Sequence, residues 1–210
     1  MSEETNDVSI KAILLGEAGV GKTNLIRRAM GLNFEVNTDS NLTSSYCQNE
    51  TIVDNIKYPY QLWDTAGQEK FRSLNQIFIK NSKVIMIVFA INSKKSFDQI
   101  DFWLNYAKET LGNDGYIFGL VANKLDLYEQ QEIEDEEIKE KANKLKIKFI
   151  MTSAATDESG FKNFLDELLT DFIKKYYSKD IPQETSFTIN KRKHIKKKKT
   201  FLEKLKSCFT

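Results

Sequence analysis

Residues 10–23 read IKAILLGEAGVGKT, a short apolar run followed directly by a glycine-rich loop. The run Ile10–Leu15 has the length and composition of a buried strand, and residues 16–23 fit the pattern G-x-x-x-x-G-K-[ST]. Glycines let backbone N–H groups converge on phosphate oxygens, and the start of the following helix adds its partial positive charge. We therefore predict a phosphate-binding loop formed by Gly16, Ala18, Gly19, Val20, Gly21, Lys22, Thr23 and Asn24.

Lys22 and Thr23 supply the charged and metal-binding groups of this loop. The Lys22 ammonium can reach the β- and γ-phosphates of a nucleotide, and the Thr23 hydroxyl can ligate Mg²⁺. A chance match within a glycine turn is the alternative, and the strand–loop–helix order argues against it. The pattern is common to proteins that use ATP and to proteins that use GTP.

A second loop with phosphate chemistry follows the candidate strand Tyr58–Trp63. Asp64, at the end of that strand, can hold Mg²⁺, usually through water. Gly67 can offer its N–H to a γ-phosphate, and Gln68 can orient an attacking water. Asp-Thr-Ala-Gly is also an ordinary turn with an Asp cap, but its place after a phosphate loop favours a nucleotide site. Gln68 and Lys22 are the predicted catalytic residues.

The loop Asn123–Asp126 follows the apolar run Ile117–Ala122 and carries groups that can select a base. Guanine presents an N1–H and an exocyclic N2–H₂ that one carboxylate accepts in parallel, whereas adenine lacks this donor pair. Asp126 is therefore the predicted discriminating residue, and Asn123 braces the pocket. Taken alone, the four residues Asn123–Asp126 are better explained as the polar end of a loop. The order of the four candidate loops along the chain, each after a strand, supports a base-binding site. Further predicted contacts are Lys124, whose stem packs over the base, Leu127, Ser153, Ala154, whose N–H would meet O6, and Ala155.

Short apolar runs alternate with segments of helical period over most of the chain. The expected strands are Ile10–Leu15, Tyr46–Val53, Tyr58–Trp63, Val84–Ile91, Ile117–Ala122 and Phe149–Met151. The expected helices lie near Thr23–Met30, Ser96–Leu111, Asp135–Leu145 and Gly160–Tyr177. This alternation predicts an α/β fold whose mainly parallel sheet is covered on both faces, with the ligand at the carboxyl ends of the strands.

Residues Trp63–Leu74 read WDTAGQEKFRSL, and residues Ile87–Asn92 read IVFAIN. Together with the loops above, these stretches resemble the guanine-nucleotide signature of the Ras superfamily over nearly all of residues 10–177, and they are similar to its Rab branch. The resemblance implies a three-layer P-loop NTPase G domain with a six-stranded, mainly parallel sheet and about five helices. It also implies a GTP/GDP cycle with Mg²⁺ and a Phe34 ring that packs edge-on against the guanine.

The resemblance further implies a GTP-binding molecular switch in vesicle traffic, which would meet an exchange factor, an activating protein and effectors through residues 34–46 and 65–81. The switch ligand of Mg²⁺ falls at Asn41, where relatives have a threonine, and Thr43 takes its place if the loop shifts register. Relatives also commonly have a lysine at Ala155. No arginine is obviously placed to stabilise the transition state, so we expect slow GTP hydrolysis that an arginine supplied in trans accelerates by roughly 10³–10⁵.

Two other functions compete with a cycling switch. The first is a nucleotide-binding scaffold module that does not cycle, which the amide at Asn41 favours. The second is a P-loop ATPase or kinase, which the carboxylate of Asp126 opposes.

The tail differs in composition from the rest of the chain, so we expect a G domain over residues 1–177 and a basic tail over residues 178–210. Between Lys191 and Thr210, nine basic residues outnumber one acidic residue, a net charge of +8, which leaves −7 for the remainder of a chain whose total is +1. A basic tail on an acidic body favours an anionic membrane surface as the partner of residues 191–209. A nucleic-acid partner for Lys196–Lys199 is the less favoured interpretation, and a disordered, solvated tail is the other alternative.

Cys208 is the candidate lipidation site, although its place third from the end does not make a C-a-a-X box. One lipid together with a polybasic stretch would meet the two-signal requirement for stable anchoring. The N-terminal residues are polar and acidic, unlike a signal peptide, and the run Val84–Ile91 is too short to cross a bilayer. We therefore expect a cytoplasmic protein that is peripheral on the cytosolic face of an internal membrane.

Overall fold

The computed structural model describes residues 9–36, 46–65 and 72–177. Contacts divide the chain into Met1–Ser178 and Lys179–Thr210, and the described residues all belong to the first part. The predictions made for Asn41, Thr43, Gly67, Gln68 and Cys208 lie outside the described residues.

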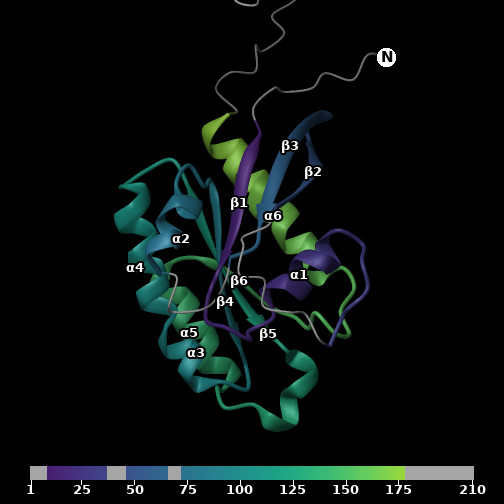
Figure 1. The fold of residues 1–210 in the computed structure, drawn as a ribbon, viewed down its shortest axis with the longest axis vertical. Helices are drawn as coiled ribbons and strands as arrows, with labels where there is room; N and C mark the ends of the chain where they lie inside the picture. The colour runs from purple at the N-terminus through teal and green to yellow at the C-terminus, as the bar shows by residue number, and fades with distance from the viewer. Residues whose placement is uncertain (1–8, 37–45, 66–71, 178–210) are drawn as a thin grey trace, which may run out of the picture. The chain divides into compact units, whose positions relative to one another are not determined.

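Six strands form one sheet in the order β2-β3-β1-β4-β5-β6 (Figure 1). Strand β2 is antiparallel to β3, and all other neighbours are parallel. This arrangement confirms the predicted six-stranded, mainly parallel sheet, and it places the loops after β1, β3, β5 and β6 at the carboxyl edge of the sheet. The strands are β1 (Ile10–Leu15), β2 (Tyr46–Val53), β3 (Ile56–Trp63), β4 (Val84–Ala90), β5 (Ile117–Asn123) and β6 (Lys148–Met151).

The helices differ from the sequence prediction in two places. Helix α2 was not predicted as a helix, and the single helix expected over Ser96–Leu111 is divided at Gln99. Ser96 explains this division, because its hydroxyl accepts from the Ala90 N–H at 3.0 Å and fixes a short helix to the end of β4. No described helix combines the length and the apolar character that crossing a bilayer requires. The α-helices are α1 (Lys22–Ala29), α2 (Arg72–Ile79), α3 (Lys94–Asp98), α4 (Ile100–Leu111), α5 (Asp135–Leu145) and α6 (Gly160–Tyr176), with a 3₁₀ helix at Leu125–Gln130.

Two apolar cores lie on opposite faces of the sheet. Val84, Met86 and Val88 of β4 belong to the core under α1 and α6, whereas Ile85 and Ile87 belong to the core under α3, α4 and α5 (Figure 1). All seven residues of β4 are buried. A central parallel strand that is covered on both faces requires apolar side chains at every position, and this explains the unbroken apolar run in the sequence.

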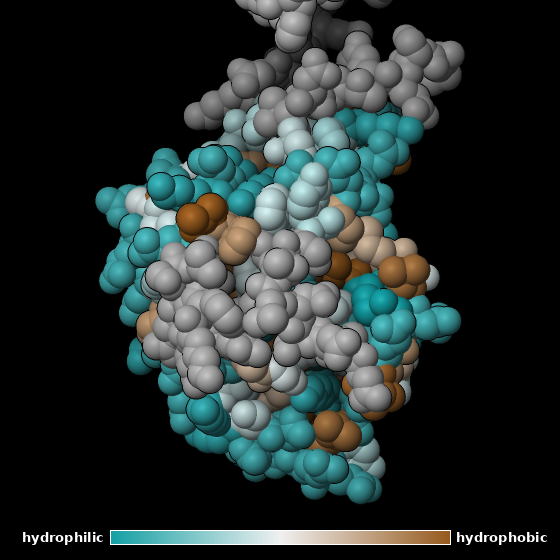
Figure 2. Space-filling model, viewed as in Figure 1, coloured by the Kyte–Doolittle hydropathy of each residue, from teal (hydrophilic) through white to brown (hydrophobic). Residues whose placement is uncertain are grey.

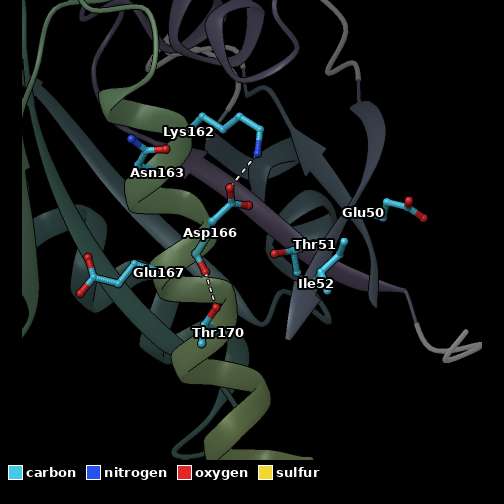
Figure 3. Close-up of a pocket in the computed structure, with 8 residues that line it drawn as sticks. All are labelled: Glu50, Thr51, Ile52, Lys162, Asn163, Asp166, Glu167 and Thr170. Carbon is cyan, nitrogen blue, oxygen red and sulfur yellow. Dashed lines mark hydrogen bonds and ion pairs between the residues drawn. The ribbon is translucent and has the colours of Figure 1, made fainter. Parts of the chain in front are cut away.

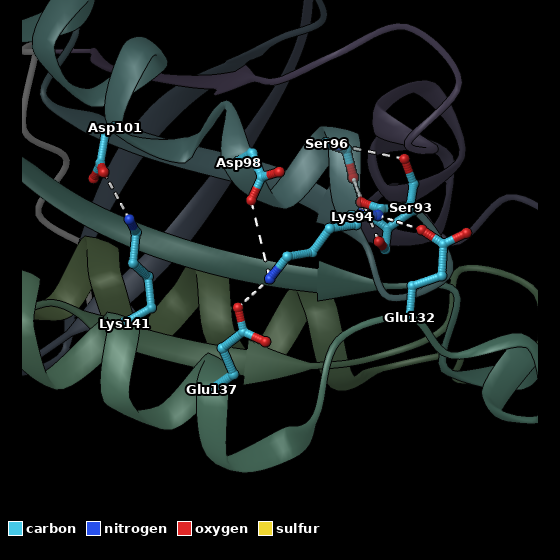
Figure 4. Close-up of polar contacts among 9 residues, drawn as sticks. Ser93, Lys94, Ser96, Asp98, Asp101, Glu132, Glu137 and Lys141 are labelled. Carbon is cyan, nitrogen blue, oxygen red and sulfur yellow. Dashed lines mark hydrogen bonds and ion pairs between the residues drawn. The ribbon is translucent and has the colours of Figure 1, made fainter.

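Ion pairs tie α3 and α4 to α5 at the rim of the second core (Figure 4). Lys94 pairs with Glu137, and Lys141 Nζ lies 2.7 Å from Asp101 Oδ2. The Lys94 backbone N–H donates to the Glu132 carboxylate at 2.6 Å. Exposed pairs of this kind contribute about 0–1 kcal/mol each, so the apolar core and not this network holds α5 in place.

Candidate nucleotide-binding site

Two glycines bring the phosphate loop into direct contact with neighbouring strands. A Cβ atom on Gly16 would lie 2.1 Å from the Val88 carbonyl oxygen of β4. Gly21 has a φ of +97°, and a Cβ there would lie 2.3 Å from Asn123 Nδ2 at the end of β5. Any other residue at Gly16 would clash with the β4 backbone, and one at Gly21 would displace the Asn123 amide and strain a left-handed backbone. The loop therefore rests on the ends of β4 and β5.

Lys22 lies inside the loop and is 5% exposed. Its ammonium donates to the carbonyl oxygens of Gly16 at 2.9 Å and Glu17 at 2.8 Å. Burial lowers the pKa of Lys22 to about 8, against the opposing influence of the Asp64 and Glu17 carboxylates. The ammonium is thus held within the loop, and a phosphate anion bound beside it would raise its pKa again.

Thr23 and Asp64 are brought together from α1 and the end of β3. The Thr23 hydroxyl donates to Asp64 Oδ2 at 2.6 Å. Asp64 Oδ1 is buried and has no hydrogen-bond partner within the described part of the chain. Burial raises the pKa of Asp64, while the bond from Thr23 and the charge of Lys22 act against this rise.

The donor set at Thr23 and Asp64 fits Mg²⁺. A hydroxyl, a carboxylate with a free oxygen and adjacent phosphates are the ligands that this ion takes in nucleotide sites, with water completing the shell. The described residues contain no cluster of three or more His, Cys, Asp or Glu side chains that would favour an all-protein metal site. When bound, the ion would neutralise phosphate charge next to Thr23 and Asp64.

Asn123 joins the phosphate loop to the last loop of the sheet. Its Nδ2 donates to the Val20 carbonyl at 2.8 Å, and its Oδ1 accepts from the Ala154 N–H at 3.0 Å. Asn123 thus connects these two loops directly, as its predicted bracing role requires. The Ala154 N–H already has an acceptor in Asn123, so a guanine O6 would be its second acceptor.

Asp126 and Ser153 lie in hydrogen-bond contact, with the Ser153 hydroxyl donating to Asp126 Oδ1. The same hydroxyl accepts from the backbone N–H groups of Ala155 and Thr156, each at 3.1 Å. A carboxylate can accept about four hydrogen bonds, so Asp126 keeps acceptor sites for a base. Lys124 adopts a left-handed φ of 69°, and the next N–H, from Leu125, donates to the Thr152 carbonyl at 3.1 Å; Leu127 follows within the 3₁₀ helix.

Three polar residues of α1 have contacts that the sequence did not reveal. Asn24 was predicted to bind nucleotide, but its side chain bonds to the backbone of Glu35, so only its backbone remains for a phosphate. Arg27 also bonds to the segment around Phe34. Arg28 bonds to the carbonyls of Ala154 and Ala155. These contacts join segments up to 127 residues apart, and no local motif announces them.

An exposed aromatic cluster lies beside the site. Tyr46 stacks on Trp63 with ring centroids 4.7 Å apart, and Phe78 of α2 lies 6.1 Å from Trp63. Tyr46 and Ile77 are 52% and 65% exposed. On the face shown in Figure 2, the described hydrophobic residues form small separate groups on a mainly hydrophilic surface. Tyr46 and Phe78 fall within the two segments predicted to meet partner proteins, and Trp63 of β3 packs against both.

A groove of about 520 Å³ lies between β2 and α6, away from the predicted loops (Figure 3). Lys162 and Asp166 form an ion pair of 2.6 Å across one turn of α6 inside it. No residue of the predicted nucleotide site lines this groove, which is formed by Glu50, Thr51, Ile52, Lys162, Asn163, Asp166, Glu167 and Thr170.

The sequence model of the Ras family matches residues 11–175 of the chain, and this range includes each of the loops discussed above. The chain belongs to the Ras family. This Ras-family protein is also similar to the GTP-binding protein ypt3 of Schizosaccharomyces pombe, with 31% identity over 172 residues that cover 82% of this chain and 79% of ypt3. The predicted identity of a Rab-like small GTPase of the Ras superfamily is confirmed. Membership of this family supports a GTP-binding switch.

Proposed function

We propose that this Ras-family protein is a Rab-like switch that hydrolyses GTP slowly and regulates membrane traffic. The observation that carries the proposal is one connected cradle: Thr23 bonds to Asp64 at the phosphate end, and Ser153 bonds to Asp126 at the base end. Asn123 links the two ends. In this proposal Mg²⁺ is held by Thr23 and Asp64, with Asn41 or Thr43 added in the GTP state, and the Phe34 ring packs edge-on against the base.

In this proposal, GTP hydrolysis depends on positive charge placed beside the phosphates and on an oriented water molecule. Lys22 supplies positive charge at the β- and γ-phosphates, and Gln68 orients the attacking water. The described residues include Arg27 and Arg28, and both bond to other loops, which leaves no described arginine of α1 free to act on the phosphate. We therefore expect slow turnover that an activating protein raises. A protein that binds GTP but gives no single-turnover hydrolysis with an activating extract would instead be the non-cycling scaffold module.

Membrane and partner contacts complete the proposal. Residues 34–46 and 65–81 meet the exchange factor, activating protein and effectors, with Tyr46 and Phe78 as their described apolar anchors and Trp63 of β3 packed against both. Residues 191–209 lie on the anionic cytosolic face of an internal membrane, with a lipid on Cys208.

A change of base specificity tests the site. Xanthine carries a carbonyl oxygen where guanine has its 2-amino group, so Asp126→Asn should exchange an acceptor for a donor at the position that faces it. We expect the variant to bind xanthosine diphosphate better than GDP by at least about tenfold, the effect of one bidentate contact of about 1–3 kcal/mol. Equilibrium competition against a fluorescent nucleotide measures this ratio. Wild-type protein that prefers ADP, or a variant with unchanged preference, would contradict the proposal.

A further inference from the structure

Two residues of α1 hold the segment that carries Phe34. Asn24 Nδ2 donates to the Glu35 carbonyl at 2.9 Å, and Asn24 Oδ1 accepts from the Glu35 N–H at 3.0 Å. Arg27 Nε donates to the Asn33 carbonyl at 3.0 Å, and its Nη2 lies 2.5 Å from Glu35 Oε1. Phe34 therefore stands between two residues that are both bonded to α1.

The apolar residues of this segment lie outside both described apolar cores. Phe34 is 38% exposed and Val36 is 85% exposed. Asn24, in contrast, is buried. Since hydrogen bonds are stronger where water is excluded, the two-way bond between the Asn24 amide and the Glu35 backbone is the main described restraint on the Phe34 ring.

The next residue of the same helix holds the opposite side of the site. Arg28 Nε donates to the Ala154 carbonyl, and Arg28 Nη2 donates to the Ala155 carbonyl, both at 2.8 Å. The planar fork of a guanidinium suits two adjacent acceptors, and a lysine cannot reproduce this geometry. Ala154 and Ala155 follow Ser153, which bonds to Asp126. Arg28 is thus connected to the Asp126 carboxylate through the short loop Ser153–Ala155.

We propose that α1 is the common support of both sides of the base pocket and sets how long a nucleotide stays bound. Asn24 and Arg27 position Phe34 against the base, and Arg28 positions the loop that orients Asp126. All three are positioning residues, because they act through other groups and not on the nucleotide itself. The inference rests on the proposed function, since it needs a guanine nucleotide between Phe34 and Asp126.

A double-mutant cycle tests the Phe34 side. Asn24→Leu keeps a side chain of similar shape and removes both hydrogen bonds to Glu35. We expect GDP release about tenfold faster, equivalent to about 1.4 kcal/mol. Phe34→Ala should also speed release. If Asn24 acts through the ring, adding Asn24→Leu to Phe34→Ala should change the rate less than twofold, because coupled sites are not additive. Full multiplication of the two effects, or wild-type release from Asn24→Leu, would overturn this part.

A base analogue tests the Arg28 side. Inosine diphosphate keeps the N1–H of guanine and lacks the 2-amino group that Asp126 would accept, so the ratio of GDP affinity to inosine diphosphate affinity reports on the 2-amino contact. We expect Arg28→Gln to weaken GDP about tenfold and inosine diphosphate less than threefold, which reduces the preference for guanine. Asn24→Leu should weaken both nucleotides equally, because a ring over the base does not sense its edge. Equal losses for both nucleotides in Arg28→Gln would mean general loosening and would overturn the assignment.

Lys139→Gln is the control, because it breaks an exposed ion pair with Glu136 at 2.7 Å on α5, which covers the opposite face of the sheet from α1. It should release GDP at the wild-type rate, and a faster release would overturn the assignment of the effect to α1. Binding of GDP by the wild-type protein is measured first. Its absence would refute the proposed function, whereas normal wild-type binding with unaltered variants would refute only the support role of α1.

Discussion

Lys22 is an ammonium group whose nearest partners are neutral carbonyl oxygens. Burial lowers its pKa from 10.5 to about 8, although two carboxylates act against the change. The unfolded chain therefore holds this proton more tightly than the folded, nucleotide-free protein does. Across this interval the unfolded state binds more protons, so the stability of the nucleotide-free protein rises between about pH 8 and pH 10.5, by about 3 kcal/mol in all.

Nucleotide phosphates should reverse this shift and make GDP binding take up a proton. At pH 7 Lys22 is protonated in both the free and the bound state, so no uptake from this group is expected. At about pH 9 the free protein has mostly lost the proton and the bound protein has regained it, so uptake should approach one proton per GDP. Calorimetry in buffers of different ionisation enthalpy measures the number. Proton release at pH 9 would show that the phosphates do not face Lys22.

Gly119 sets the distance between β5 and α6 at the level of whole elements. A Cβ there would lie 2.5 Å from Leu168 Cδ1 and 3.1 Å from two ring carbons of Phe164. Both side chains belong to the apolar stripe of α6 and are buried. The absence of a side chain at one strand position thus lets the helix lie close to the sheet.

Gly119→Ala should destabilise the protein by about 1–3 kcal/mol through overpacking. Leu168→Ala alone should cost about 2–5 kcal/mol, because it leaves a cavity. In that cavity the added methyl group has room, so Gly119→Ala should cost less in the Leu168→Ala background than in the wild type. Urea unfolding of the GDP-loaded proteins measures all three differences. Strictly additive losses would mean that the helix moves away and that Leu168 does not resist the methyl group.

The elements that sequence reasoning placed well are those with a strong period or an unbroken apolar run. Helix α6 shows its buried stripe at helical spacing, and β4 is buried on both faces. Helix α2 was missed, and the division at Gln99 depends on Ser96 meeting the end of β4. The chemistry of the loops was readable because it lies in local motifs. The role of Arg28 was not, because its acceptor at Ala154 is 126 residues away.

At the scale of the whole molecule, charge is divided between the two parts of the sequence. The stretch from Lys191 carries +8 and the preceding residues carry −7. A body with a net negative charge is repelled by an anionic membrane, so the tail alone must supply the electrostatic attraction. Lysines near such a surface contribute about 1 kcal/mol each, and this attraction weakens as salt is added.

Flotation with anionic vesicles should separate charge from lipid. The unmodified protein from a bacterial host should bind at low salt and dissociate at about 0.5 M salt, where screening is nearly complete. Protein isolated from a eukaryotic host should stay bound at that salt concentration if a lipid is attached, and its Cys208→Ser variant should not. Equal salt resistance of both eukaryotic forms would exclude Cys208 as the anchor.

The stacked pair of Tyr46 and Trp63 gives the protein a built-in optical signal. The Trp63 ring also contacts β1 and α2, with Lys11 Nζ 4.4 Å and the Phe78 ring 6.1 Å from its centroid. Trp103, the other indole of the chain, is buried and bonds to Glu17. An intrinsic fluorescence change during nucleotide exchange would therefore come from two separate reporters, one at the outer aromatic cluster and one beneath the phosphate loop. Replacing either tryptophan with phenylalanine would allow the aromatic cluster and the phosphate loop to be timed independently, without attaching a dye.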